Sequence, residues 1–190
     1  MGENKFFKIF KEIGGYVLII VAVIAIRIFI FDPIRVDGPS MNDTLCDGEI
    51  IVLNKFHYRR SDIKRYDIVV VKVYDASTRS TKKIIKRVIG LPNEKIEIKD
   101  NKVYANGEEL DNSFTSTETD DFSIEDLGLQ KIPGNSYLVL GDNRRISLDS
   151  RDKTVGTIKK EDIVGKAEII IFPFNKIGSV YKSTNKKCGK

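Results

Sequence analysis

Histidine is almost absent from this chain of 190 residues. The single histidine, His57, lies in the basic stretch 55–60, whose composition is typical of a solvated loop. A Ser-His-Asp triad needs a histidine packed against the serine, with a carboxylate behind it. The sequence therefore argues against a hydrolase of the triad type.

Cysteine is also scarce, with only Cys46 and Cys188 present. Cys188 belongs to the C-terminal tail, so we expect no structural disulfide between the two. A free Cys46 would pack as a small apolar side chain.

Neither sign of charge dominates, because Lys plus Arg number 32 and Asp plus Glu number 27. This modest excess gives no sign of a nucleic-acid-binding groove, so no nucleic-acid partner is expected. Several of the lysines crowd a basic tail, 182–190. That tail is typical of a solvated chain end, and contact with acidic lipid headgroups is the alternative.

Only one long apolar run is present, residues 15–31, and it carries a single charge, Arg27. A membrane span needs roughly 17 to 25 residues, and a long arginine side chain near the end of the run can reach the interface. A cleavable signal peptide is the alternative, but no Ala-x-Ala site follows the run. We expect an uncleaved transmembrane anchor over 15–31.

Lysines precede this run at Lys5, Lys8 and Lys11, whereas Asp32 and Asp37 follow it closely. By the positive-inside tendency, residues 1–14 are cytoplasmic and the rest of the chain is outside. We therefore expect a single-pass protein of the cell membrane with one extracytoplasmic domain, 32–181. Its length of roughly 150 residues is enough for a core of ordinary size.

Helical patterns are missing beyond the anchor, where short runs rich in Val and Ile recur instead. They are Glu49–Leu53, Asp67–Tyr74, Lys82–Leu91, Lys95–Lys99, Lys102–Ala105, Ser136–Leu140 and Asp162–Phe172. Such spacing predicts an all-β domain, so the predicted fold is mainly β with one N-terminal helix. Asp100-Asn101 indicates a two-residue hairpin turn, and Asn106-Gly107 marks another turn.

The strand pattern lapses over 111–130, where polar residues dominate. We interpret this segment as an exposed loop or a small subdomain. Calcium binding by its acidic residues is an alternative, but their spacing lacks the alternating ligands and central glycine of a calcium loop. No metal or cofactor is expected.

Ser40 and Lys86 are the candidates for chemistry. A serine hydroxyl is a poor nucleophile until a base removes its proton, and a lysine is a base only when it is neutral. With a pKa near 10.4, only about one lysine in 2,500 is neutral at pH 7. In a strand, Lys86 lies between Ile84 and Val88 on one face, so either that face is exposed or the lysine is neutral. Both interpretations stay open on this local pattern.

Four motifs follow the anchor in order. They are Val36–Leu45 with its Gly-Pro-Ser-Met turn, Arg65–Val71, Lys86–Pro92 and Gly141–Arg151. Together they closely resemble the type I signal peptidases, in the single-anchor form typical of Gram-positive bacteria. The resemblance runs from the anchor to Phe172–Phe174, and only 111–130 falls outside it.

The resemblance implies a serine endopeptidase that removes signal peptides from secreted preproteins after Ala-x-Ala-type sites. Ser40 matches the nucleophile and Lys86 the general base. Ser147 matches the hydroxyl that orients the lysine amine. Two supporting ion pairs are implied as well, Arg87 with Asp142 and Asp149 with Arg151.

The resemblance also implies a mode of substrate binding. Shallow apolar pockets for small residues at −1 and −3 would be lined by Val36, Met41, Leu45, Ile84 and Ile85. The substrate would lie extended and pair with strand edges near Asp37 and Ile84. The backbone N–H of Ser40 would hold the oxyanion, and a side-chain hydroxyl that some relatives add is missing because that position is Gly38.

Three other functions stay open. A non-catalytic anchored relative of the kind associated with pilus building typically lacks the serine or the lysine. A self-cleaving repressor shares the dyad but should begin with a DNA-binding domain. An anchored β-domain that only binds a partner would leave the motifs unexplained. We expect a monomeric peptidase whose partners are signal-peptide-bearing preproteins and membrane lipid.

Overall fold

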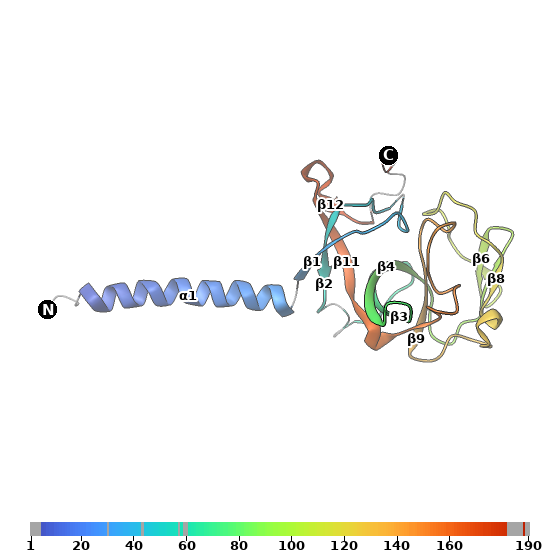
Figure 1. Cartoon of the computed structure of the whole chain (residues 1–190), viewed down its shortest axis with the longest axis horizontal. Coiled ribbons are helices and arrows are strands. Elements are labelled where there is room, and N and C mark those ends of the chain that lie inside the picture. The colour runs from blue at the N-terminus through green and yellow to red at the C-terminus, as the bar shows by residue number, and fades with distance from the viewer. Residues whose placement is uncertain are drawn as a thin grey trace.

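One long helix precedes a β-rich body in this computed structural model, which describes residues 5–29, 31–42, 44–56, 58, 61–181 and 188. The helix, α1 (Lys5–Phe29), projects away from the body, and the N-terminus lies at its far end (Figure 1). The helix begins at Lys5, ten residues before the apolar run, and Phe31, the last residue of that run, belongs to the first strand.

The apolar side chains of α1 are exposed between Ile13 and Ile24, and Leu18, for example, is 69% exposed. Within the described ranges, the structure contains no helix that is both long enough and apolar enough to cross a membrane. The anchor expected over 15–31 stays a prediction.

A large antiparallel sheet forms most of the body. Its strands are β1 (Phe31–Arg35), β2 (Ile50–Asn54), β3 (Ile68–Asp75), β4 (Ser80–Gly90), β9 (Ser136–Leu140), β10 (Ile158–Lys159), β11 (Ile163–Phe172) and β12 (Gly178–Ser179). They run in the order β1-β2-β11-β3-β4-β9-β10, and β12 pairs with β11. Strand β11, from near the end of the chain, therefore lies between two strands from the first half of the chain, β2 and β3.

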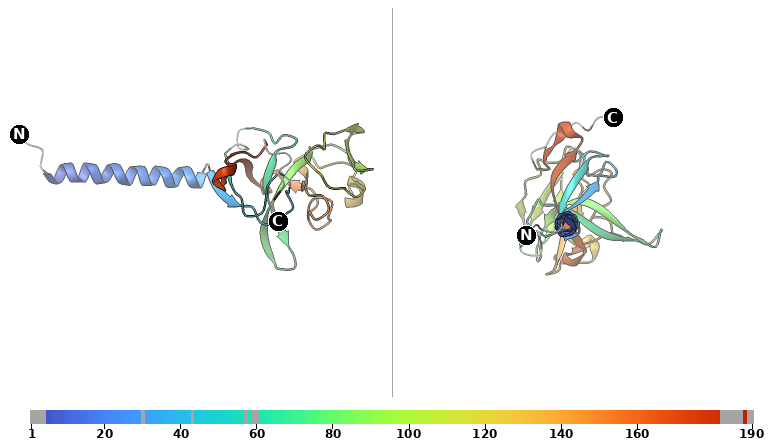
Figure 2. Two further views of the ribbon diagram at one scale, coloured as in Figure 1. Left: turned by 90° about the horizontal axis from the view of Figure 1, so that it is seen from above. Right: turned by 90° about the vertical axis from the view of Figure 1, so that its left-hand side faces the viewer.

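A smaller sheet lies at the end of the body farthest from α1 (Figure 2). It contains β5 (Ile96–Lys99), β6 (Lys102–Ala105), β7 (Glu108–Glu109) and β8 (Phe122–Ser123), in the order β7-β6-β5-β8. Asp100 and Asn101 join β5 to β6 with φ values of 50° and 65°. Positive φ at both central positions is what a two-residue hairpin turn of type I′ requires, so this predicted turn is confirmed.

The mainly β fold is confirmed, and β6 and β9 have the predicted bounds. The prediction missed β1, whose first residue was assigned to the anchor, and the two-residue strands β7, β8, β10 and β12. Strands this short are too brief for an alternating pattern.

Segment 111–130 is more ordered than an exposed loop. Phe114, Phe122 and Ile124 are buried in a core with residues of β5, β6 and β9. A short 3-10 helix, η1 (Ile124–Leu127), begins after Ser123, whose hydroxyl accepts a hydrogen bond from Glu125 N. The segment thus packs as part of the subdomain that contains the smaller sheet. Its mostly polar composition did not indicate that three of its apolar side chains are buried.

Strand β4 is longer than its pairing with β9. It pairs with β3 over Ser80–Arg87, but β9 pairs only with the part from Arg87 to Gly90. The β3–β4 hairpin consequently projects from the body (Figure 2), and β9 leaves the edge of residues 80–86 uncovered. Lys86 lies where this uncovered edge ends.

Cys46 and Cys188 form a disulfide, so the expectation of a free Cys46 was wrong. Separation in the sequence, 142 residues, did not indicate separation in space. Cys46 is only 7% exposed and follows the turn that carries Ser40. The bond therefore ties the end of the chain to this turn. The rest of the predicted basic tail, 182–187 and 189–190, lies outside the described residues, as does His57.

Removing this crosslink should lower stability. Cys188→Ser is expected to decrease the free energy of unfolding by about 2–4 kcal/mol, because the unfolded chain regains the entropy that a long closed loop denies it. Denaturant unfolding of the detergent-solubilised protein measures the change. Reductant should lower the stability of the wild type to the same level and leave the variant unaffected. Equal stability of the two oxidised proteins would contradict the prediction.

Candidate active site

Ser40 lies in a tight turn between β1 and β2. Gly38 has a φ of +81°, which favours glycine, so this position is unsuited to the hydroxyl-bearing residue of some relatives. After Ser40, the backbone N–H groups of Thr44 and Leu45 donate to Met41 O at 2.9 and 2.8 Å. The buried side chains of Met41 and Leu45 hold this turn on the core.

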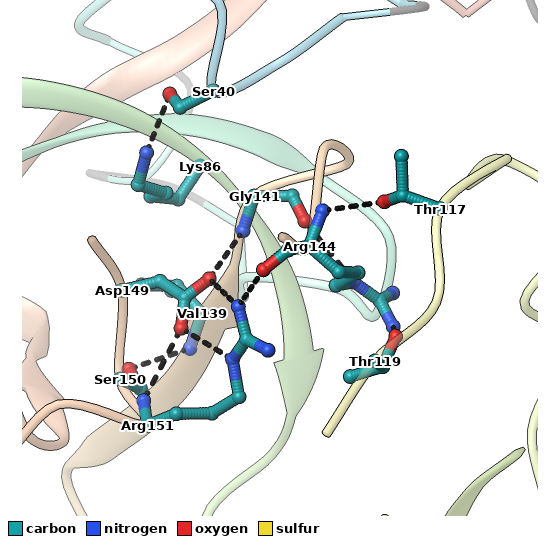
Figure 3. Close-up of polar contacts among 10 residues, drawn as sticks. All are labelled: Ser40, Lys86, Thr117, Thr119, Val139, Gly141, Arg144, Asp149, Ser150 and Arg151. Atoms are coloured by element: carbon teal, nitrogen blue, oxygen red, sulfur yellow. Dashed lines mark hydrogen bonds and ion pairs between the residues drawn. The ribbon is translucent and has the colours of Figure 1, made fainter. Parts of the chain in front are cut away.

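Lys86 lies directly beside Ser40. Its side chain is 2% exposed, and its Nζ lies 2.7 Å from Ser40 Oγ (Figure 3). The structure thus brings together two residues that are 46 positions apart in the sequence.

Burial lowers the pKa of Lys86 from 10.5 to about 8, while the nearby carboxylates of Asp149 and Asp142 oppose the shift. Desolvation disfavours the charged amine. With such a pKa, about one amine in ten is neutral at pH 7, and a neutral amine can accept the proton of Ser40 Oγ. Of the two interpretations that the sequence left open, the structure supports the buried lysine.

Arg87 points to the opposite face of β4 and pairs with Asp142. Its Nε and Nη2 donate to the two carboxylate oxygens at 2.9 and 2.6 Å. Thr44 Oγ1 also donates to Asp142 Oδ2, at 2.5 Å, and accepts from Arg87 Nη2 at 3.2 Å. All three residues are buried, so this cluster joins β4 to the turn after Ser40. Thr44 stood within a recognised motif, but it had been assigned no role.

Asp149 and Arg151 form the second pair, with N–O distances of 2.9 and 3.0 Å. Asp149 Oδ2 also accepts from Gly141 N at 3.0 Å, and Arg151 Nη2 donates to Arg144 O at 2.6 Å (Figure 3). These bonds close residues 141–151 into a compact loop, which we call the Asp149 loop.

The Asp149 loop contacts the backbone of Ser40 through Asn143. Asn143 N donates to Ser40 O at 3.1 Å, and its side-chain amide donates to Pro39 O at 3.3 Å. A β-carbon at Gly141 would clash with Ser147 and with Ser40 O. Glycine is therefore required where the loop meets the turn. Asn143 lies within the recognised Gly-Asp-Asn-Arg motif, but the sequence did not indicate its partner.

Ser147 does not make the expected bond to Lys86. Its Oγ is buried and has no hydrogen-bond partner among the described residues, whereas the Lys86 amine lies against Ser40. Ser147 instead packs against Gly141. The orientation of the lysine in this structure comes from its burial and from Ser40.

A groove of about 390 Å³ adjoins Ser40 and Lys86. Its walls include Val36, Met41, Ile84 and Ile85, four of the five residues expected to line it. Leu45 does not line it, because this residue is fully buried in the core cluster that also contains Met41.

A larger cavity, of about 810 Å³, lies under the β3–β4 hairpin. It shares Lys82 and Ile84 with the smaller groove but is not lined by Ser40 or Lys86. The smaller groove is therefore the candidate site. Within the described ranges, no three His, Cys, Asp or Glu side chains are grouped so that they could hold a metal ion.

Comparison with known proteins points to one family. The sequence model of the family described as "Signal peptidase, peptidase S26" matches residues 9–172. Signal peptidase I P of Bacillus subtilis subsp. natto is 35% identical over 181 residues, which cover 92% of this chain and 95% of that protein. Signal peptidase I V of Bacillus subtilis (strain 168) is 39% identical over 168 residues, which cover 83% and 95%. The crystal structure of a signal peptidase I from Enterococcus faecalis V583 matches with a TM-score of 0.47 and 32% identity, covering 56% of this chain and 97% of that one.

The buried amine should cost stability. Below pH 8 the lysine is charged in the folded and the unfolded protein, so folding bears the full cost of burying the charge, and this cost fades as pH approaches 10.5. Lys86→Met should therefore raise the free energy of unfolding at pH 7 by about 1–3 kcal/mol, with a smaller gain at pH 10. Denaturant unfolding at both pH values measures this.

The exposed Lys72 supplies the control for this substitution. Lys72→Met should leave stability nearly unchanged at both pH values. A Lys86→Met variant that is less stable than the wild type at pH 7 would mean that the contacts of the amine outweigh its desolvation.

Proposed function

This chain belongs to the signal peptidase family, peptidase S26, and we propose that it removes N-terminal signal peptides from secreted preproteins after Ala-x-Ala-type sites with Ser40 and Lys86 as its catalytic dyad. Signal peptidases I are serine endopeptidases, and thus hydrolases, and this chain is one of them. The observation that carries the assignment of the dyad is the 2.7 Å distance between Ser40 Oγ and the buried Lys86 amine.

The neutral Lys86 amine accepts the hydroxyl proton as Ser40 Oγ attacks the carbonyl carbon of the scissile bond. The backbone N–H of Ser40 stabilises the oxyanion that forms. When the C–N bond breaks, the Lys86 ammonium gives its proton to the leaving amine, and an acyl-enzyme remains. Lys86 then takes a proton from the water that attacks this ester. As the bond between the acyl carbon and Ser40 Oγ breaks, the Lys86 ammonium gives that proton to Oγ, which restores both residues and releases the carboxylate product.

The two ion pairs support this chemistry without touching the substrate. Arg87 and Asp142 join β4 to the Asp149 loop, and Asp149 and Arg151 hold that loop closed. Asp149 and Asp142 also lie close enough to Lys86 to stabilise its ammonium form. The carboxylates thereby counteract part of the desolvation of the amine.

The groove beside Ser40 receives the residues before the cleavage site. Val36, Met41, Ile84 and Ile85 offer small apolar walls, which suit alanine at −1 and −3. The edge of β4 over residues 80–86 is not covered by β9. An extended signal peptide adds to this edge through backbone hydrogen bonds, with Asp37 on the other side of the groove.

Residues 15–29 of α1 anchor the enzyme in the cell membrane, with the N-terminus in the cytoplasm and the body outside. The exposed apolar side chains of the helix and the lysines before them support this arrangement. A tethered monomer meets signal peptides at high effective concentration, because they emerge at the same membrane surface.

Mass spectrometry of a model preprotein with an Ala-x-Ala site tests the reaction. The detergent-solubilised enzyme should cut once, after the second alanine. Ser40→Ala and Lys86→Met should each keep less than about a hundredth of the activity, since each removes one half of the dyad. Cleavage by either variant at a higher level would contradict the dyad. If the folded wild type leaves a competent preprotein intact, a non-catalytic anchored module becomes the better assignment.

The pH profile tests the role of Lys86. Because the base must be neutral and the pKa of Lys86 is lowered to about 8, kcat/KM should rise about tenfold per pH unit below this value and level off above it. Initial rates between pH 6 and 10 measure the profile. A profile that is flat from pH 6 to 9 would exclude a titrating base with this pKa.

A further inference from the structure

Residues 112–119, which we call the threonine segment, lie against the Asp149 loop although they fall outside the recognised motifs. Their side chains alternate in exposure, with Phe114 and Thr119 buried and Ser113 and Glu118 exposed. The residues of this segment that contact the Asp149 loop or Arg87 include Asn112, Phe114, Thr115, Thr117 and Thr119. The segment therefore forms an outer wall of the active-site loop.

The hydroxyls of Thr115 and Thr117 form hydrogen bonds with the backbone on both sides of Asn143. Thr115 Oγ1 donates to Asp142 O at 2.6 Å, and Thr117 Oγ1 accepts from Arg144 N at 2.8 Å. The Thr117 contact is drawn in Figure 3. Between these two bonds, the N–H of Asn143 donates to Ser40 O. The carbonyl that Thr115 binds thus belongs to the same peptide group as the Asn143 N–H, and the N–H that Thr117 binds belongs to the next peptide group.

The buried side chain of Arg144 also joins the threonine segment to the Asp149 loop. Its guanidinium donates to Gly141 O at 3.0 Å, Thr119 Oγ1 at 3.2 Å and Asn112 Oδ1 at 2.6 Å. Arg144 is 2% exposed. A buried guanidinium needs such acceptors, because an unsatisfied buried donor is costly. The threonine segment supplies two of the three.

Phe114 connects the segment to the ion pair behind Lys86. Its ring centroid lies 4.4 Å from Arg87 Cζ and 5.7 Å from Arg144 Cζ. The quadrupole of an aromatic ring attracts a guanidinium group placed over its face. The ring consequently helps to hold Arg87 against Asp142.

We propose that Thr115 and Thr117 are positioning residues of the peptidase reaction, whose hydroxyls hold Asn143 where its amide orients the Ser40 backbone toward Lys86. The proposal rests on the proposed function. Neither threonine touches the groove or the reacting atoms. Their effect is on the rate because a displacement of about 1 Å between reacting groups can cost about a hundredfold.

Thr117→Val tests this, because valine keeps the shape of threonine but cannot accept the bond from Arg144 N. The kcat for the model preprotein should fall about tenfold while KM stays near the wild-type value, since the walls of the groove are unchanged. Thr117→Ser restores the acceptor and should restore most of kcat. Ser113→Ala, which removes an exposed hydroxyl of the same segment, should behave as the wild type.

Hydrogen exchange gives a readout that needs no cleavage. In Thr117→Val without substrate, amides of residues 141–144 and 40–45 should exchange faster than in the wild type, with those of β5 and β6 unchanged. If the wild type cleaves the preprotein and Thr117→Val has the same kcat and the same exchange rates as the wild type, the positioning role is overturned while the proposed function stands. Equal loss in Thr117→Val and Thr117→Ser would also overturn it, since shape rather than the hydroxyl would then matter. If the wild type does not cleave, the proposed function fails. Exchange rates in Thr117→Val that equal those of the wild type would then still show that Thr117 does not hold the Asp149 loop.

Discussion

The desolvation of one amine is the constraint around which the rest of this site is arranged. A lysine at the edge of a sheet would ordinarily extend into water and stay charged. Here the turn that carries Ser40 covers Lys86, and burial brings its pKa down to about 8. Burial disfavours the charged form of the amine, and the nearby carboxylates of Asp149 and Asp142 favour it. The proposed proton transfer needs both forms of the amine.

A single strand supplies both the buried amine of the proposed dyad and the guanidinium of a buried ion pair. Lys86 and Arg87 are neighbours on β4, so their side chains point to opposite faces. Lys86 meets Ser40, and Arg87 meets Asp142 in a buried pair. The order of the two residues therefore places the amine beside Ser40 and the guanidinium in the ion pair on the other face of the strand.

The site is stabilised from outside by parts of the chain that carry none of its chemistry. The disulfide fastens the turn beyond Ser40 to the C-terminal tail. On the other side, the threonine segment holds the Asp149 loop, which in turn contacts the Ser40 carbonyl. Two neutral hydroxyls suit this task, since they bind backbone groups without adding charge beside an amine whose protonation is sensitive to it.

Features that depend on near neighbours could be predicted from the amino-acid order alone. They include the strands β6 and β9, the turn at Asp100-Asn101, and Ser40 and Lys86 as the candidate pair, because alternation, turn chemistry and motifs extend over a few residues. Other features depended on the tertiary structure, namely the Cys46–Cys188 bond, the burial of Leu45, the packing of Ser147 against Gly141 and the buried side chains of 111–130. Each results from contacts between distant segments. Whether Lys86 is exposed or buried belongs to this second group, since the residues that cover it come from a turn 46 positions earlier.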